Sequence, residues 1–159
     1  MRPLITALLL LVSLSAVAQP TRLDGSTLDG RPFSLEALRG KVVMLFFWNT
    51  DCAPCLQKMP ELRANAAGWR GKPFELVLVS TDRDRSAALG YLQTVKQVDR
   101  SGMPLATLWL GDLRLGGGLA ALPAGVPLTL VIDAQGAVQS RHAGRISDEA
   151  WDEVAGLLP

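Results

Sequence analysis

The order of the strongest patterns along this chain predicts a mixed α/β sheet with helices on both faces. Three apolar segments, residues 41–48, 74–80 and 128–132, show no polar alternation, as expected of strands that are covered on both sides. Helix-like segments follow the first two of them, and a hairpin partner with a last helix follows the third. At 159 residues, the chain suits one domain with a well-formed core.

The composition excludes two broad classes of protein. Lys and Arg total 16 against 15 Asp and Glu, so the net charge of +1 gives no electrostatic sign of a nucleic-acid partner. Hydrophobic residues make up 48% and charged residues 19%, a globular rather than a disordered balance. Because the only long apolar stretch lies at the N-terminus, a polytopic membrane protein is also excluded.

Residues 1–18 have the pattern of a signal peptide. Arg2 provides the positive start, an apolar stretch runs from Leu4 to Val17, and residues 16–18 (Ala-Val-Ala) fit a cleavage site. The stretch is shorter than the roughly 20 residues that span a bilayer, which favours cleavage after Ala18 over an uncleaved anchor. We therefore expect an exported domain over residues 19–159, located in the periplasm of a Gram-negative host.

The first half of the exported domain begins with turn signals. Asp24-Gly25 and Asp29-Gly30 are turn dipeptides that bracket a possible hairpin, and Ser34 can cap a short helical turn. Asn49-Thr50-Asp51 ends the strand over 41–48, and apolar spacing predicts a helix from Cys52. Pro60 is expected to kink this helix.

The second half alternates strand and helix signals. Asp82 or Asp84 can cap a helix that runs to Val98, and the run from Asp82 to Arg85 is interpreted as a solvated helix entry. The other expected elements are a short strand at 105–110, an ambiguous segment at 113–122, a hairpin strand at 137–143 and a last helix from Ser147 to Leu158.

Cys52 and Cys55 are the only cysteines and carry the strongest functional signal. In an exported protein two such close thiols tend to pair, yet a loop this short gains little stability from a disulfide. A disulfide that is repeatedly reduced and reformed during function explains the pair better. At a helix N-terminus the free N–H groups and the helix dipole stabilise a Cys52 thiolate, and Cys55, at position i+3, can resolve a mixed disulfide. Pro54 is tolerated in a first helical turn.

Three segments together resemble the TlpA/ResA/CcmG group of exported thiol–disulfide oxidoreductases. They are residues 47–60 (FWNTDCAPCLQKMP), 29–41 (DGRPFSLEALRGK) and 125–136 (GVPLTLVIDAQG). The resemblance implies a thioredoxin-like fold and a protein-disulfide reductase whose redox carrier is the cysteine pair, with no other cofactor. It further implies protein thiol clients such as apocytochrome c and a membrane thiol-reductant donor, in cytochrome c maturation or thiol repair. Because CxxC pairs span potentials of about −270 to −120 mV, an oxidising direction stays open. We also expect a monomer.

The resemblance also assigns site residues. Pro127 corresponds to the cis-proline of the fold, Val126 before it offers its backbone to a partner peptide, and Trp48 is delivered beside the cysteines. Two positions depart from the family: Asp51 replaces a Trp, and Lys58 replaces a Glu thought to assist proton transfer. We expect Asp51 to raise the pKa of the Cys52 thiol and Lys58 to offset this partly.

Two alternative functions remain open at this stage. A thiol peroxidase needs Thr or Ser three residues before its reactive cysteine, where this chain has Asn49. A copper- or zinc-binding module could combine the cysteine pair with His142, the only histidine. Related copper-handling proteins, however, place three residues between their cysteines, and we expect no metal site.

Overall fold

The computed structural model describes residues 21–98, 105–120 and 125–159. Its centre is a five-stranded mixed sheet in the order β5-β4-β3-β7-β8. The strands of this sheet are β3 (Val42–Trp48), β4 (Phe74–Ser80), β5 (Ala106–Trp109), β7 (Leu128–Ile132) and β8 (Val138–Ala143). The pairs β3–β4 and β4–β5 are parallel, whereas β3–β7 and β7–β8 are antiparallel.

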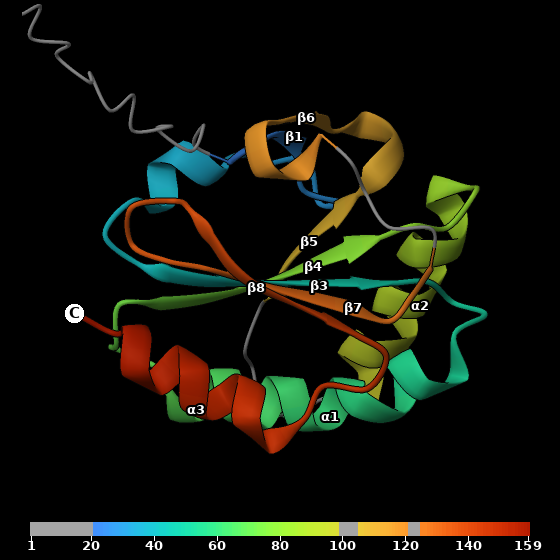
Figure 1. Ribbon diagram of the computed structural model, residues 1–159. Helices are drawn as coiled ribbons and strands as arrows, with labels where there is room; N and C mark the ends of the chain where they lie inside the picture. The colour runs from blue at the N-terminus through green and yellow to red at the C-terminus, as the bar shows by residue number, and fades with distance from the viewer. Residues whose placement is uncertain (1–20, 99–104, 121–124) are drawn as a thin grey trace, which may run out of the picture.

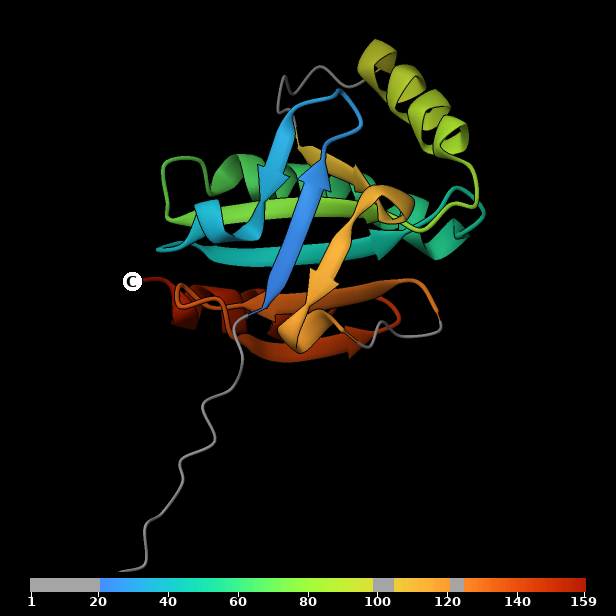
Figure 2. The same ribbon diagram turned by 90° about the horizontal axis from the view of Figure 1, so that it is seen from above.

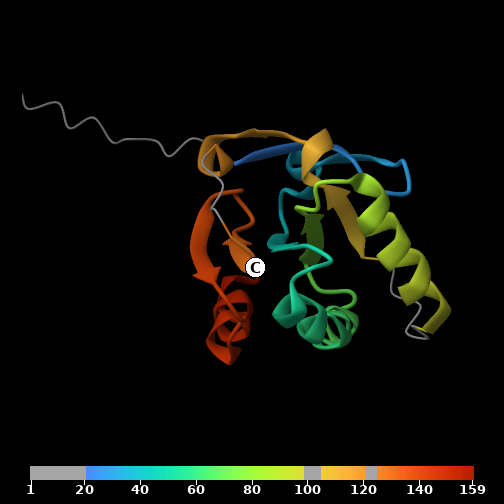
Figure 3. The ribbon, with the colours of Figure 1, turned by 90° about the vertical axis from the view of Figure 1, so that its right-hand side faces the viewer.

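Different elements cover the two faces of the sheet (Figure 1). Helices α1 (Ala53–Gly68) and α3 (Asp148–Leu157) lie on one face, and α2 (Arg85–Val98) lies beside the β5 edge (Figures 2 and 3). A three-stranded antiparallel sheet in the order β2-β1-β6 lies over the other face. Its strands are β1 (Arg22–Ser26), β2 (Pro32–Ser34) and β6 (Arg114–Gly116), and the short 3₁₀ helices are η1 (Leu35–Leu38), η2 (Leu110–Asp112) and η3 (Gly117–Leu119).

Strand β3 explains why the core has two halves. All seven of its residues are buried, and alternate side chains enter opposite layers because strand side chains alternate across a sheet. Val42, Met44, Phe46 and Trp48 join the half-core with α1 and α3. The intervening residues join the half-core beneath the small sheet. The unbroken apolar sequence of β3 is thus accounted for, and the predicted thioredoxin-like α/β fold is confirmed. The expectation of helices on both faces is wrong, because the small sheet covers the second face (Figure 1).

Two local expectations are wrong, and one ambiguous segment is resolved. Asp24-Gly25 lies inside β1, and the turn instead spans Thr27 to Arg31, whose N–H and C=O groups are joined at 2.8 Å. Ser34 precedes η1 without capping it, because its hydroxyl donates to the Asp24 carboxylate at 2.6 Å. The ambiguous segment at 113–122 contains β6 and η3 within its described part.

The predicted signal peptide, residues 1–18, lies outside the described residues. Within the described part of the chain, none of the helices has the length and apolar character needed to cross a bilayer.

Candidate active site

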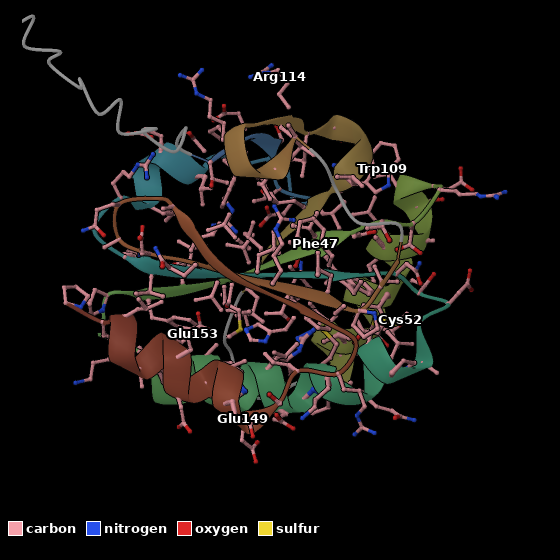
Figure 4. The ribbon with its side chains drawn as sticks, in the orientation of Figure 1. Phe47, Cys52, Trp109, Arg114, Glu149 and Glu153 are labelled. Carbon is pink, nitrogen blue, oxygen red and sulfur yellow. A yellow bond between two sulfur atoms is a disulfide. The ribbon has the colours of Figure 1, made fainter. Side chains whose placement is uncertain are left out.

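Cys52 and Cys55 form a disulfide at the start of α1 (Figure 4). Their Cα atoms lie 5.2 Å apart, and Cys52 is 8% exposed while Cys55 is fully buried. Cys52 is the N-cap residue of α1, and its sulfur accepts a hydrogen bond from the Cys55 N–H at 3.2 Å. The same N–H can stabilise a Cys52 thiolate, so the outer sulfur is the one suited to attack.

Helix α1 holds the cysteine pair at its N-terminus. Pro54 lies in its first turn, where a missing N–H costs no helical hydrogen bond. Cys55, Met59, Leu62 and Ala66 form its buried stripe, at the spacing predicted from the sequence. The helix runs through Pro60 to Gly68. Packing of this stripe fixes the helix against the sheet, and hence fixes Cys55.

The Val126–Pro127 peptide bond is cis. Leu128 pairs with Phe47 in the antiparallel β3–β7 ladder, so the residues before Leu128 lie beside the end of β3. Cys52 follows that same end of β3, and Val126 packs against the half-core that contains both cysteines. The structure thus brings residues 126 and 127 to the edge of the sheet that carries the cysteine pair.

Trp48 does not form part of an exposed binding surface. Its side chain is fully buried and packs against Tyr91 of α2, with ring centroids 4.8 Å apart. Burial raises the pKa of the Tyr91 phenol, although the neighbouring Arg63 opposes this shift. The expected role of Trp48 in contacting a partner is therefore wrong. The last side chain of β3 points inward and packs in the same buried cluster as the two cysteines.

The two predicted pKa-tuning charges have different surroundings. Asp51 is exposed, directly before Cys52. Lys58 is only 15% exposed, and its ammonium donates to both oxygens of the Glu61 carboxylate at 2.6 and 2.7 Å. Lys58 lies one turn after Cys55, but the Glu61 carboxylate compensates its charge. This pairing is not among the sequence-based expectations, although the i, i+3 spacing of Lys58 and Glu61 is a visible signal.

A second missed residue is Asp82, which follows β4. Its carboxylate accepts hydrogen bonds from the Thr50 N–H at 2.9 Å and the Thr50 hydroxyl at 2.6 Å. The Ser80 hydroxyl donates to its other oxygen at 2.7 Å. Asp82 is therefore not a solvated residue at the start of a helix, as expected, but accepts hydrogen bonds from the loop that precedes Cys52. β3 and β4 are parallel, so their carboxyl ends meet at one edge of the sheet. A polar residue that directly follows β4 is therefore expected near the loop that follows β3, and this signal could have identified Asp82 from the sequence.

His142 lies on β8 and interacts with a carboxylate. Its Nε2 atom lies 3.1 Å from Glu153 of α3 and 2.8 Å from the Ser140 hydroxyl. Among the described residues, no group of three or more His, Cys, Asp or Glu side chains is arranged to hold a metal ion.

A cleft of about 500 Å³ lies at the far end of α1 from the cysteines. Residues lining it include Trp69, Arg70, Lys72 and Phe74. Trp69, Phe74 and Trp151 pack together there, with ring centroids 5.0 to 6.3 Å apart. Trp69 and Trp151 are thus packing aromatics in this structure.

The chain is similar to known thiol–disulfide exchange proteins. Residues 16–141 match the AhpC/TSA family. A protein from Yersinia pestis named "Thiol:disulfide interchange protein DsbE" is 31% identical over 140 residues, which cover 87% of this chain and 67% of that protein. A "Thiol-disulfide oxidoreductase ResA" from Halalkalibacterium halodurans is 25% identical over 82% of this chain and 70% of its own.

A solved structure supports the fold independently. The crystal structure of a thiol:disulfide interchange protein of the thioredoxin family from Chlorobium tepidum superposes with a TM-score of 0.67. The similarity covers 90% of this chain and 99% of that chain at 23% sequence identity.

Proposed function

Since the chain belongs to the AhpC/TSA family, among its DsbE- and ResA-type thiol–disulfide oxidoreductases, we propose that it works as a reductant of disulfides in exported proteins. The observation that carries the proposal is the Cys52 sulfur at the N-terminus of α1, beside the Val126–Pro127 segment. Its clients would be oxidised thiol proteins such as apocytochrome c, in cytochrome maturation or thiol repair.

The proposed reaction moves two electrons and needs no further cofactor. The Cys52 thiolate attacks one sulfur of the client disulfide, which forms a mixed disulfide and releases the other client sulfur as a thiolate. The Cys55 thiolate then attacks the Cys52 sulfur. The client leaves with two reduced cysteines, and this chain ends with the Cys52–Cys55 disulfide seen in the structure. A thiol donor at the membrane would restore the reduced pair.

The Val126–Pro127 segment is proposed to bind the client. Val126 precedes β7 at the cysteine edge, where its backbone groups can pair with an extended peptide. Export would place the protein in the periplasm, where its clients meet oxidants. We further propose that the signal peptide is cleaved after Ala18 and that the exported protein is a monomer.

The reduction potential of the Cys52–Cys55 pair tests the direction of the reaction. The mature protein is equilibrated with dithiothreitol or glutathione buffers, and the oxidised fraction is measured. We expect a potential near that of thioredoxin, about −270 mV, as a reductant requires. A value near −120 mV would make the protein an oxidant, because dedicated oxidants lie there. Turnover of hydrogen peroxide, assayed in parallel, would instead support the peroxidase function.

A further inference from the structure

The loop between β3 and α1 is held by a carboxylate from the neighbouring strand. Asp82 accepts two hydrogen bonds from Thr50 on one oxygen and one from Ser80 on the other. Thr50 lies two residues before Cys52, in the short connection that leads from the buried strand to the reactive helix. A main-chain N–H bonded to a charged acceptor is among the stronger hydrogen bonds in proteins.

Asp82 is itself held in place on its backbone side. Its carbonyl accepts a hydrogen bond from the Trp109 indole at 2.8 Å, and Thr81 before it donates its N–H to the Trp48 carbonyl at 2.7 Å. Gly111 packs so closely on the Trp109 ring that a Cβ there would lie 2.4 Å from it. Figure 4 shows Trp109 on the same side of the molecule as Cys52. These hydrogen bonds fix the backbone at Asp82, and with it the position from which the Asp82 carboxylate reaches Thr50.

We propose that Asp82 is a positioning residue for the exchange reaction: through Thr50 it keeps Cys52 at the N-terminus of α1 after the disulfide has been reduced. The inference rests on the proposed role of Cys52 as the attacking thiolate. In the oxidised form the S–S bond already fixes Cys52 to Cys55. Reduction removes that restraint, whereas the Asp82–Thr50 hydrogen bonds are independent of it.

The position of Cys52 matters because its thiolate is stabilised only there. The Cys55 N–H and the end of the helix dipole reach the sulfur while Cys52 remains the N-cap residue. A loop released from Asp82 lets Cys52 leave the cap, which raises the pKa of its thiol. Loss of the negative charge of Asp82 has the opposite effect and lowers this pKa, because a carboxylate disfavours a nearby thiolate. Loss of position and loss of charge therefore shift the reactivity in opposite directions.

Four variants of the full exported chain separate these two effects. Asp82→Ala removes both the hydrogen bonds and the charge, whereas Asp82→Asn removes the charge but keeps an oxygen that can accept from Thr50. Thr50→Val removes one donated hydrogen bond, and Thr50→Ser keeps it. Asp84→Ala is a matched control, because Asp84 is an exposed carboxylate on the same segment. The alkylation rate of Cys52 in the reduced protein is measured against pH, with a thermal melt for each variant.

We expect Asp82→Ala to move the midpoint of the pH profile upward and to lower the rate at pH 7 about three- to tenfold. Thr50→Val is expected to shift the profile in the same direction by a smaller amount. Asp82→Asn, which loses only the charge, is expected to leave the midpoint at or slightly below that of the wild type. Thr50→Ser is expected to keep the wild-type profile, and Asp84→Ala to leave it unchanged. If Asp82→Ala does not fold, the two Thr50 variants decide the question.

The proposal is overturned if the Asp82→Ala and Thr50→Val profiles match the wild type. It is also overturned if Asp82→Ala moves the midpoint downward, because loss of charge would then outweigh loss of position. It is overturned as well if Asp82→Asn moves the midpoint as far upward as Asp82→Ala, because an oxygen that accepts from Thr50 would then not be enough to position Cys52. Its failure is distinguishable from that of the proposed function. An oxidising potential in the wild-type protein would reject the reductant role and leave the order of the variants intact.

Discussion

The two ends of α1 are held in place by different forces. At the first turn the hydrogen bonds from Thr50 to Asp82 and from Cys55 to Cys52 fix the chain, and Asp51 is exposed. At the last turn Trp69 packs with Phe74 and Trp151. Burial there is not directional, whereas hydrogen bonds specify where single atoms lie. A reactive sulfur must be placed accurately, which hydrogen bonds can do and burial alone cannot. The cysteine pair accordingly lies at the hydrogen-bonded end of α1.

The sharpest test of this contrast is removal of the reactive sulfur. Cys52→Ser is expected to abolish the reduction of insulin disulfides, a loss of at least about 100-fold, because the attacking thiolate is gone. Cys55→Ser should instead leave Cys52 able to trap partners as mixed disulfides, detectable on non-reducing gels. Normal turnover by both variants would contradict the proposed mechanism.

At the aromatic end we expect a large change in stability with no change in chemistry. Phe74 is 8% exposed, so Phe74→Ala should lower the free energy of unfolding by about 3 kcal/mol through lost packing. Urea denaturation measures this loss. The alkylation profile of Cys52 in the folded variant should match the wild type. A shifted profile would show that the two ends are coupled through the helix.

Lys58 tests how charge acts from within α1. Lys58→Glu replaces the cation with an anion and leaves Glu61 without its partner, so the pKa of each thiol of the cysteine pair should rise and alkylation near pH 7 should slow. Lys58→Met is the matched control, which removes the charge without reversing it and should give a smaller rise. An unchanged pH profile in both variants would mean that the ammonium acts only on Glu61.

Asp51 is expected to give the smallest effect. Its carboxylate is exposed, so solvent screens it from the Cys52 sulfur. Asp51→Asn should lower the pKa of the Cys52 thiol and slightly speed its alkylation near pH 7. The same alkylation profile measures it. A rise in this pKa would contradict a simple charge effect and would indicate a hydrogen bond lost from the loop.

The sequence predicts the apolar framework better than the polar contacts. β4 and the buried stripe of α1 appear as expected, because burial imposes a period that residue types reveal. The bridge from Asp82 to Thr50 joins residues 32 positions apart and depends on the register of β3 with β4. No local pattern encodes such a register. Trp48 was misjudged for a related reason, since one residue at a strand end decides whether a side chain points in or out.

The chain enters β1 at the edge of the central sheet that lies opposite Cys52. The Thr21 N–H donates to the Gly136 carbonyl in the turn after β7, and that turn lies at the start of β3, opposite Cys52. Given the length of β3, about 20 Å of sheet separates the two edges. The C-terminus also leaves on the side away from Cys52 (Figures 1 and 4). A fusion partner, affinity tag or electrode linker joined at either end would therefore leave the redox edge facing outward and free to meet its clients.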